Sequence, residues 1–136
     1  MEEKKVVRPL PVITIANKGF WEAAKKHELR LQRCLSCKKF YYPISKMCPF
    51  CHSMDSEWAL TKGRGIIDSW IVYHQSLHPY FTKVPYAVVQ VKLEEGPRVF
   101  GNLLDTDPKD IKMGMPVKVA FEDINDEVTL PQWRRA

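Results

Sequence analysis

Four cysteines within one 18-residue stretch constrain this chain more than any other feature. They form two C-x-x-C pairs, Cys34 with Cys37 and Cys48 with Cys51, which are separated by ten residues. Each pair makes a tight turn that directs two thiolates to one side, so that two pairs can close a shell of four sulfurs. Soft thiolate ligands favour zinc or iron over magnesium or calcium. The spacing therefore predicts a closed zinc ribbon, whose metal is structural because no coordination position stays open for substrate.

Three other interpretations of the cysteines explain less. A disulfide framework is typical of small secreted domains, but the charged start, Met1-Glu-Glu-Lys-Lys5, does not resemble a signal peptide. A redox C-x-x-C motif uses one pair and leaves the second unexplained. Cys51 followed by His52 completes a C-x-x-C-H haem-attachment signature, but the upstream pair already engages both cysteines of that motif.

Composition places the chain among globular proteins. Its 136 residues are 45% hydrophobic, which fits one ordinary domain or two small ones that share an interface. No apolar run approaches the roughly 20 residues of a membrane span, and reduced metal-binding cysteines lead us to expect a cytoplasmic protein. The net charge is +6 over residues 1–62 and −1 over residues 63–136. The basic front half suggests an anionic partner, although a solvated lysine-rich surface explains the same pattern.

Hydrophobic periodicity divides the chain into three parts. Residues 1–17 contain two prolines and no clear period, which indicates an extended N-terminal arm. Residues 18–62 form the second part, the helix and four-cysteine ribbon. An amphipathic helix is expected from 18 to about 28, and ribbon strands at 29–33, 40–42 and 57–61. Gly63-Arg64-Gly65 then reads as a hinge before the third part, residues 63–136.

The third part alternates as an all-β domain does. Strands are expected at 66–75, 86–93, 98–104, 116–122 and 128–133, with at most one helical turn between 105 and 111. A long first strand and an interruption after the third fit an OB-fold barrel, and an SH3-like barrel gives a similar pattern. The predicted fold class is therefore mainly β: an N-terminal helix and a rubredoxin-like zinc ribbon, followed by a five-stranded OB-fold barrel.

An ordered set of further motifs carries a family resemblance. The set comprises Phe20-Trp21 before the cysteines, Tyr42-Pro43 between them, and Glu57-Trp58, Gly63-x-Gly65, Pro85-Tyr86, Gly96-Pro97-Arg98, Gly114-Met-Pro116-Val117 and Leu130-Pro131-x-Trp133 after them. From about residue 18 to 133 the chain resembles the zinc-ribbon and OB-fold proteins called domain of unknown function thirty-five. These proteins are associated with acyl-CoA enzymes in archaea and bacteria.

The chain departs from the family pattern in two places. The family often has glycine after the second cysteine, where this chain has Lys38. A family Pro-Pro-Arg run before the second knuckle is replaced by Pro43-Ile44-Ser45. The first change is tolerable if Lys38 avoids a positive φ or accepts its modest cost. The second removes an arginine, so no phosphate-binding arginine is carried over to this position.

The resemblance implies a non-catalytic accessory protein. Its partners would be thiolase-superfamily enzymes, of the acetoacetyl-CoA thiolase and hydroxymethylglutaryl-CoA synthase type, which it would bridge while shaping their CoA-binding sites. Phe20 and Trp21 are the candidate partner contacts, and packing of both on their own ribbon is the alternative. Arg64 is a candidate contact for a CoA phosphate, because guanidinium geometry suits phosphate.

Two other functions compete with this interpretation. The sequence contains no nucleophile elbow and no phosphate loop, and His74 and His78 are the one histidine pair that a catalytic hypothesis can use. A zinc ribbon joined to an OB barrel could instead bind single-stranded nucleic acid. Tyr86 and Phe100 lie on the strands that would form its binding face, but their module carries a net charge of −1 and attracts phosphates poorly.

Overall fold

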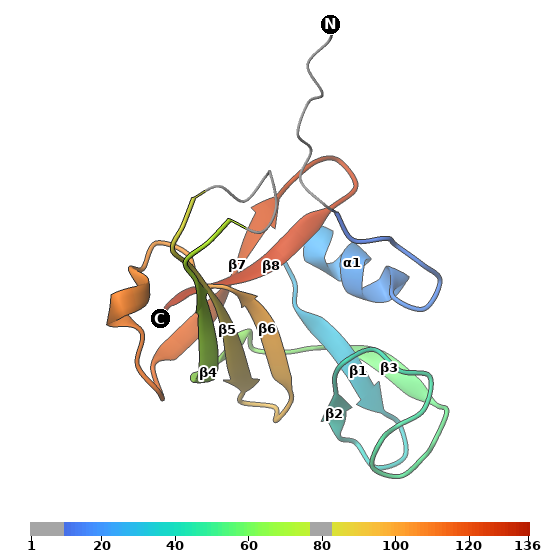
Figure 1. The fold of residues 1–136 in the computed structure, drawn as a ribbon. Helices are drawn as coiled ribbons and strands as arrows, with labels where there is room; N and C mark the ends of the chain where they lie inside the picture. The colour runs from blue at the N-terminus through green and yellow to red at the C-terminus, as the bar shows by residue number, and fades with distance from the viewer. Residues whose placement is uncertain (1–9, 77–82) are drawn as a thin grey trace, which may run out of the picture.

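The protein is described by a computed structural model that places residues 10–76 and 83–136. In these ranges a short helix and a three-stranded sheet precede a five-stranded sheet, and the two sheets lie side by side (Figure 1). Residues 1–9 of the predicted arm and His78 lie outside the described residues. This arrangement confirms the predicted mainly β fold with one N-terminal helix.

Helix α1 spans Lys18–Lys25 and buries Phe20, Ala23 and Ala24 on one face. It ends three residues before the predicted end at Glu28. His27 adopts a left-handed conformation with φ of 60°, and the amide of Glu28 donates to the Ala23 carbonyl (2.9 Å). This is a Schellman cap, in which the left-handed position is usually glycine. Because histidine fills that position here, the sequence carried no stop signal.

The ribbon sheet contains three antiparallel strands in the order β2-β1-β3. Strand β1 (Arg30–Cys34) is central, between the short β2 (Phe40–Tyr41) and β3 (Ser56–Leu60). Leu31 of β1 is fully buried, whereas β2 is an edge strand with one free side. The three strands lie within one residue of their predicted bounds.

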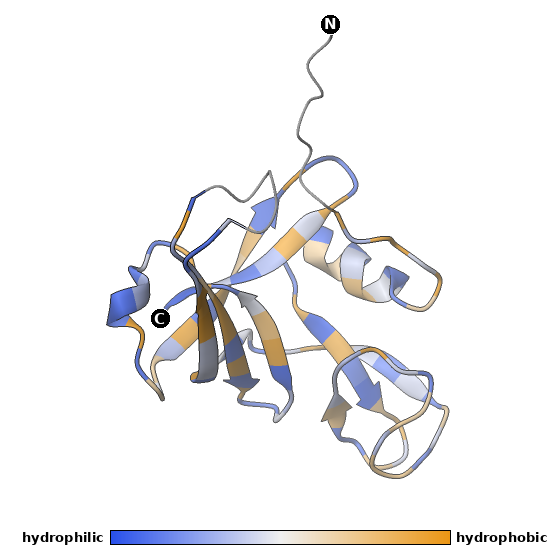
Figure 2. Cartoon of the chain, in the orientation of Figure 1, coloured by the Kyte–Doolittle hydropathy of each residue, from blue (hydrophilic) through white to orange (hydrophobic). Residues whose placement is uncertain are grey.

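The second sheet has the strand order β6-β5-β4-β7-β8, with every neighbouring pair antiparallel. Its central, long first strand pairs on both sides, which is the OB-fold arrangement that the sequence predicted. The strands are β4 (Arg64–Tyr73), β5 (Tyr86–Leu93), β6 (Arg98–Asn102), β7 (Pro116–Asp123) and β8 (Thr129–Arg135), with one 3-10 turn, η1 (Pro108–Asp110), before β7. Along β5 every second side chain is buried, and Figure 2 shows apolar residues on all five strands of this sheet.

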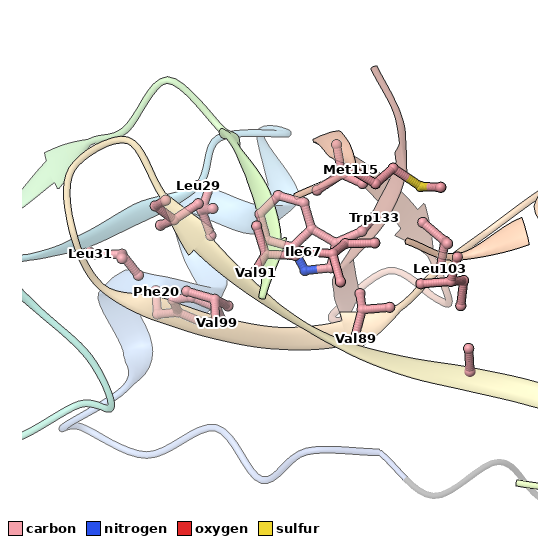
Figure 3. Packing of buried hydrophobic residues seen from close by; sticks show 14 residues of the cluster. Phe20, Leu29, Leu31, Ile67, Val89, Val91, Val99, Leu103, Met115 and Trp133 are labelled. Atoms are coloured by element: carbon pink, nitrogen blue, oxygen red, sulfur yellow. The ribbon is translucent and has the colours of Figure 1, made fainter. Parts of the chain in front are cut away.

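The five-stranded sheet approaches a barrel without closing fully. Its two outer strands meet at one isolated parallel bridge between Leu103 and Trp133. There the amide of Leu104 donates to the Trp133 carbonyl over 2.8 Å. The indole of Trp133 has no exposed surface and fills the space inside this junction (Figure 3).

The connection between the sheets is a fixed turn. Gly63 takes the turn with a positive φ of 67°, whereas Arg64 and Gly65 already belong to β4. Both the amide and the hydroxyl of Thr61 donate to the Leu29 carbonyl, over 3.0 and 2.8 Å. The predicted hinge is therefore only partly a turn, and hydrogen bonds hold it. A domain boundary at residues 62 and 63 stays a prediction.

One hydrophobic core joins the helix, the ribbon and the five-stranded sheet (Figure 3). Phe20 and Leu31 from the second part pack in the same buried cluster as Val91 and Val99 from the third. Between 10 and 76 and between 83 and 136, no helix is long and apolar enough to cross a membrane.

Candidate metal centre and binding surfaces

The two cysteine knuckles share one backbone geometry. In the first, the amide of Lys38 donates to the carbonyl of Cys34 over 3.0 Å, and in the second the amide of His52 donates to the carbonyl of Cys48 over 2.9 Å. Lys38 and His52 also adopt left-handed conformations, with φ of 63° and 65°. Lys38 therefore accepts the cost of a positive φ and does not avoid it.

These turns bring the four sulfurs together as the spacing predicted. All four Sγ atoms lie within 4.8 Å of one another. Cys34 Sγ lies 3.4 Å from Cys51 Sγ, and Cys37 Sγ lies 3.6 Å from Cys48 Sγ. Tetrahedral zinc–thiolate bonds of about 2.3 Å place sulfurs about 3.8 Å apart, so this cluster has the size of a one-zinc site.

The charges of the four cysteine thiolates favour binding of a cation in the cluster. The amide of Cys37 donates to Cys34 Sγ over 3.4 Å and is the main reason that the pKa of Cys34 falls to about 6. For Cys51, the amide of Ser53 acts to lower the pKa, but the sulfurs around it, Cys34 first, together with desolvation raise it to about 11. Four thiolates in this space thus repel one another, and a divalent metal supplies the charge that lets all four form.

Replacing Lys38 with glycine is expected to raise the free energy of unfolding by about 0.5–1 kcal/mol, because glycine adopts a positive φ without a Cβ clash. The measurement is urea denaturation of the zinc-loaded chain. Lys39→Gly is the matched control, since the neighbouring residue has no positive φ and should lose stability instead. Equal losses in the two variants would show that the backbone at Lys38 is not strained.

The two aromatic residues predicted to meet a partner have different environments. Phe20 is 6% exposed and packs in the core, so its ring offers little surface to another protein. Trp21 is half-buried and contacts the Phe20 ring edge to face, with centroids 4.9 Å apart. A partner contact by either residue stays a prediction, and Trp21 has the more accessible side chain.

Arg64 lies on the exposed side of β4, where it pairs in register with Lys118 of β7. With Lys92 and Pro116 it lines a hollow of about 490 Å³. Its contact with a CoA phosphate remains a prediction. His74 is exposed just after β4.

A second hollow, the inter-module cleft, has a volume of about 610 Å³ and was not predicted from the sequence. Residues 38–42 and Phe50 of the ribbon form one side, and residues 95–98 of the β5–β6 hairpin form the other. No short-range pattern could reveal this cleft, because its two sides are more than 40 residues apart in the chain.

The fold and the four-sulfur cluster define a zinc-ribbon protein with an OB-fold. Residues 21–56 match the model "ChsH2, rubredoxin-like zinc ribbon domain", and residues 58–122 match "ChsH2, C-terminal OB-fold domain". A DUF35 domain-containing scaffold protein of Methanocaldococcus jannaschii is 30% identical over 70% of this chain and 68% of its own length. The chain belongs to this DUF35 family, and its cofactor is zinc.

Two further relatives are more similar in sequence. A protein of Thermomonospora curvata, named "Probable enoyl-CoA hydratase alpha subunit", is 39% identical over 99% of this chain. The match covers 42% of that protein, so this chain spans less than half of its length. A solved chain described as "Ltp2-ChsH2(DUF35) aldolase" is 39% identical, with a TM-score of 0.84 over 93% of this chain and 98% of that one.

Proposed function

We propose that this chain is a non-catalytic accessory protein that binds thiolase-superfamily acyl-CoA enzymes and helps to shape or bridge their CoA-binding sites. The likeness to the ChsH2(DUF35) aldolase chain carries the proposal, since it extends over nearly the full length of both chains. The scaffold name of the methanogen relative supports the same role.

The metal centre supports a role in architecture. Its four sulfurs fill a tetrahedral shell and leave no position at which a substrate could meet the metal. The hydratase subunit is more than twice as long as the matched segment, so this chain corresponds to one portion of that protein. Chemistry would then reside in the partner, with this chain supplying a shaped surface.

The proposal is tested by a tagged pull-down from native cell extract at about 0.3 M salt, followed by mass spectrometry. Salt at this level suppresses phosphate-driven contacts while it spares apolar interfaces. We expect an acyl-CoA enzyme of the thiolase superfamily to be recovered. Recovery of nucleic acid alone, and only at low salt, would favour single-stranded nucleic-acid binding instead.

Trp21→Ala is expected to weaken binding of the partner enzyme about tenfold or more, with a smaller effect on the melting temperature. The reason is that large half-exposed aromatics dominate interface energies. Analytical gel filtration of the mixed proteins measures binding, and Leu35→Ala, at an exposed residue of the first knuckle, is the control. Unchanged binding with a lower melting temperature would show that Trp21 only stabilises the helix.

A further inference from the structure

We propose that the inter-module cleft binds an acidic, extended segment of a partner polypeptide, which adds as a strand to the free edge of β2. The identification of the partner as an acyl-CoA enzyme rests on the proposed function, whereas the chemistry of the segment rests on the cleft itself. Three independent observations support this: an open strand edge, two buried polar atoms without partners, and a basic aromatic rim.

The open edge belongs to β2, the outer strand of the ribbon sheet. The amide of Cys34 donates to the carbonyl of Lys39 over 3.0 Å, and the next residue pairs in register with Arg33. Hydrogen-bonded and non-bonded pairs alternate along an antiparallel ladder. The peptide N–H and C=O of Phe40 therefore point away from β1, toward the edge at which another strand can pair.

Two residues that line the cleft each have a buried side-chain atom without a hydrogen bond. Tyr41 is only 3% exposed, yet its hydroxyl has no partner among the described residues. The same holds for Oε1 of Glu95, whose Oε2 accepts from the amide of Lys62 over 2.9 Å. A ligand with both a donor and an acceptor would complement this hydroxyl, which can donate, and this carboxylate oxygen, which accepts. A peptide group carries one acceptor and one donor, so it can accept a hydrogen bond from the hydroxyl and donate one to the carboxylate oxygen.

The rim of the cleft selects the side chains of such a segment. Arg98 is engaged by Asp68, with Nε to Oδ2 at 2.6 Å, and this guanidinium holds the pKa of Asp68 below its usual value. Lys38 and Lys39 have no ion pair within the described parts of the chain, so they supply positive charge that is not neutralised. Phe50 is 57% exposed, and Lys39 Nζ lies 4.8 Å from the centre of its ring. Acidic side chains next to an apolar one complement this rim.

The test is a titration of the zinc-loaded, ¹⁵N-labelled chain followed by NMR. The probe is a synthetic octapeptide that alternates glutamate and valine and contains one phenylalanine. A peptide with lysine in place of glutamate is the charge control, and an oligothymidylate of eight nucleotides tests for nucleic acid. We expect the acidic peptide alone to shift the amides of residues 38–42 and those of Glu95, Gly96 and Arg98. Equal shifts from the basic peptide, or larger ones from the oligonucleotide, would overturn the proposal.

Two variants test the mechanism of binding. Lys38→Glu combined with Lys39→Glu should weaken the acidic peptide by about tenfold or more, while Lys109→Glu with Lys112→Glu, around the distant turn η1, should not. Tyr41→Phe removes the unpartnered hydroxyl, so it should weaken the peptide about three- to tenfold without lowering the melting temperature. A lower melting temperature with unchanged peptide affinity would give the hydroxyl a structural role only and would overturn this part.

A competition experiment between the peptide and the enzyme distinguishes failure of this proposal from failure of the proposed function. If the wild-type chain binds the enzyme and excess acidic peptide displaces it, the cleft is part of that interface. If the enzyme stays bound with excess peptide and with the double glutamate variant, the partner assignment of the cleft is overturned while the accessory function stands. If no acyl-CoA enzyme binds, the accessory function fails, and the peptide titration still decides what the cleft recognises.

Discussion

Replacing Cys48 with serine is expected to release the zinc ion and unfold the ribbon. Cys48 has no exposed surface, and its sulfur lies 3.6 Å from that of Cys37 inside the four-sulfur cluster. Structural zinc sites contribute about 10–16 kcal/mol of apparent binding energy, which is comparable to the whole stability of a typical domain, about 5–15 kcal/mol. Metal content by mass spectrometry and unfolding by circular dichroism measure the two effects.

The control for this variant lies in the first knuckle. The Ser36 hydroxyl donates to that of Ser53 over 3.2 Å at the exposed surface, so Ser36→Ala should keep the zinc and change stability by less than about 1 kcal/mol. Chelation of the wild-type protein should reproduce the Cys48→Ser result. A folded Cys48→Ser chain with one full equivalent of zinc would show that the four-sulfur site is not closed.

Trp133→Ala is expected to lower the free energy of unfolding by about 3–5 kcal/mol, the range for removal of a buried large aromatic side chain. The indole is fully buried beside the bridge between Leu103, which follows β6, and β8. It also fills the space that a side chain at Gly101 would need, since a Cβ there would lie 2.8 Å from the indole Cδ1. Removal therefore leaves a cavity at the place where the sheet closes least completely. Urea denaturation followed by circular dichroism measures the loss.

Two neighbouring substitutions calibrate this result. Trp133→Phe keeps most of the apolar volume and should cost less than the alanine variant. Arg134→Ala removes only an exposed pair with Asp105, at 3.1 Å, and should cost less than about 1 kcal/mol. If Trp133→Ala were no more harmful than Arg134→Ala, the indole would not stabilise the junction.

The element pattern was largely predictable because local signals agree with the tertiary fold. The alternation in Tyr86–Leu93 gave that strand without error, since every second side chain enters the core. The predicted end of the helix was wrong because His27 occupies the left-handed cap position. A sequence signals the end of a helix at this position only when the residue there is glycine. The cysteine spacing sufficed for the metal site, because each knuckle is a local turn.

The features that the sequence could not indicate depend on contacts between segments that are far apart in the chain. The meeting of Leu103 with Trp133 follows from how the five-stranded sheet curls on itself, and the sharing of one cleft by Tyr41 and Glu95 follows from how the two sheets pack. The burial of Phe20 was equally hidden, because an amphipathic helix shows which face is apolar and not whether a core or a partner covers it.

The shared core also limits how this architecture can be rearranged. Phe20 and Leu31 complete an apolar seam against Val91 and Val99, and Thr61 ties the connecting turn to Leu29. If the ribbon were replaced by that of a distant relative, its side chains would not fit the seam presented by the five-stranded sheet. The stability effects of residues in contact are not additive, so such a misfit cannot be judged from each half alone. Chimeras should therefore succeed when both sides of the seam come from one parent.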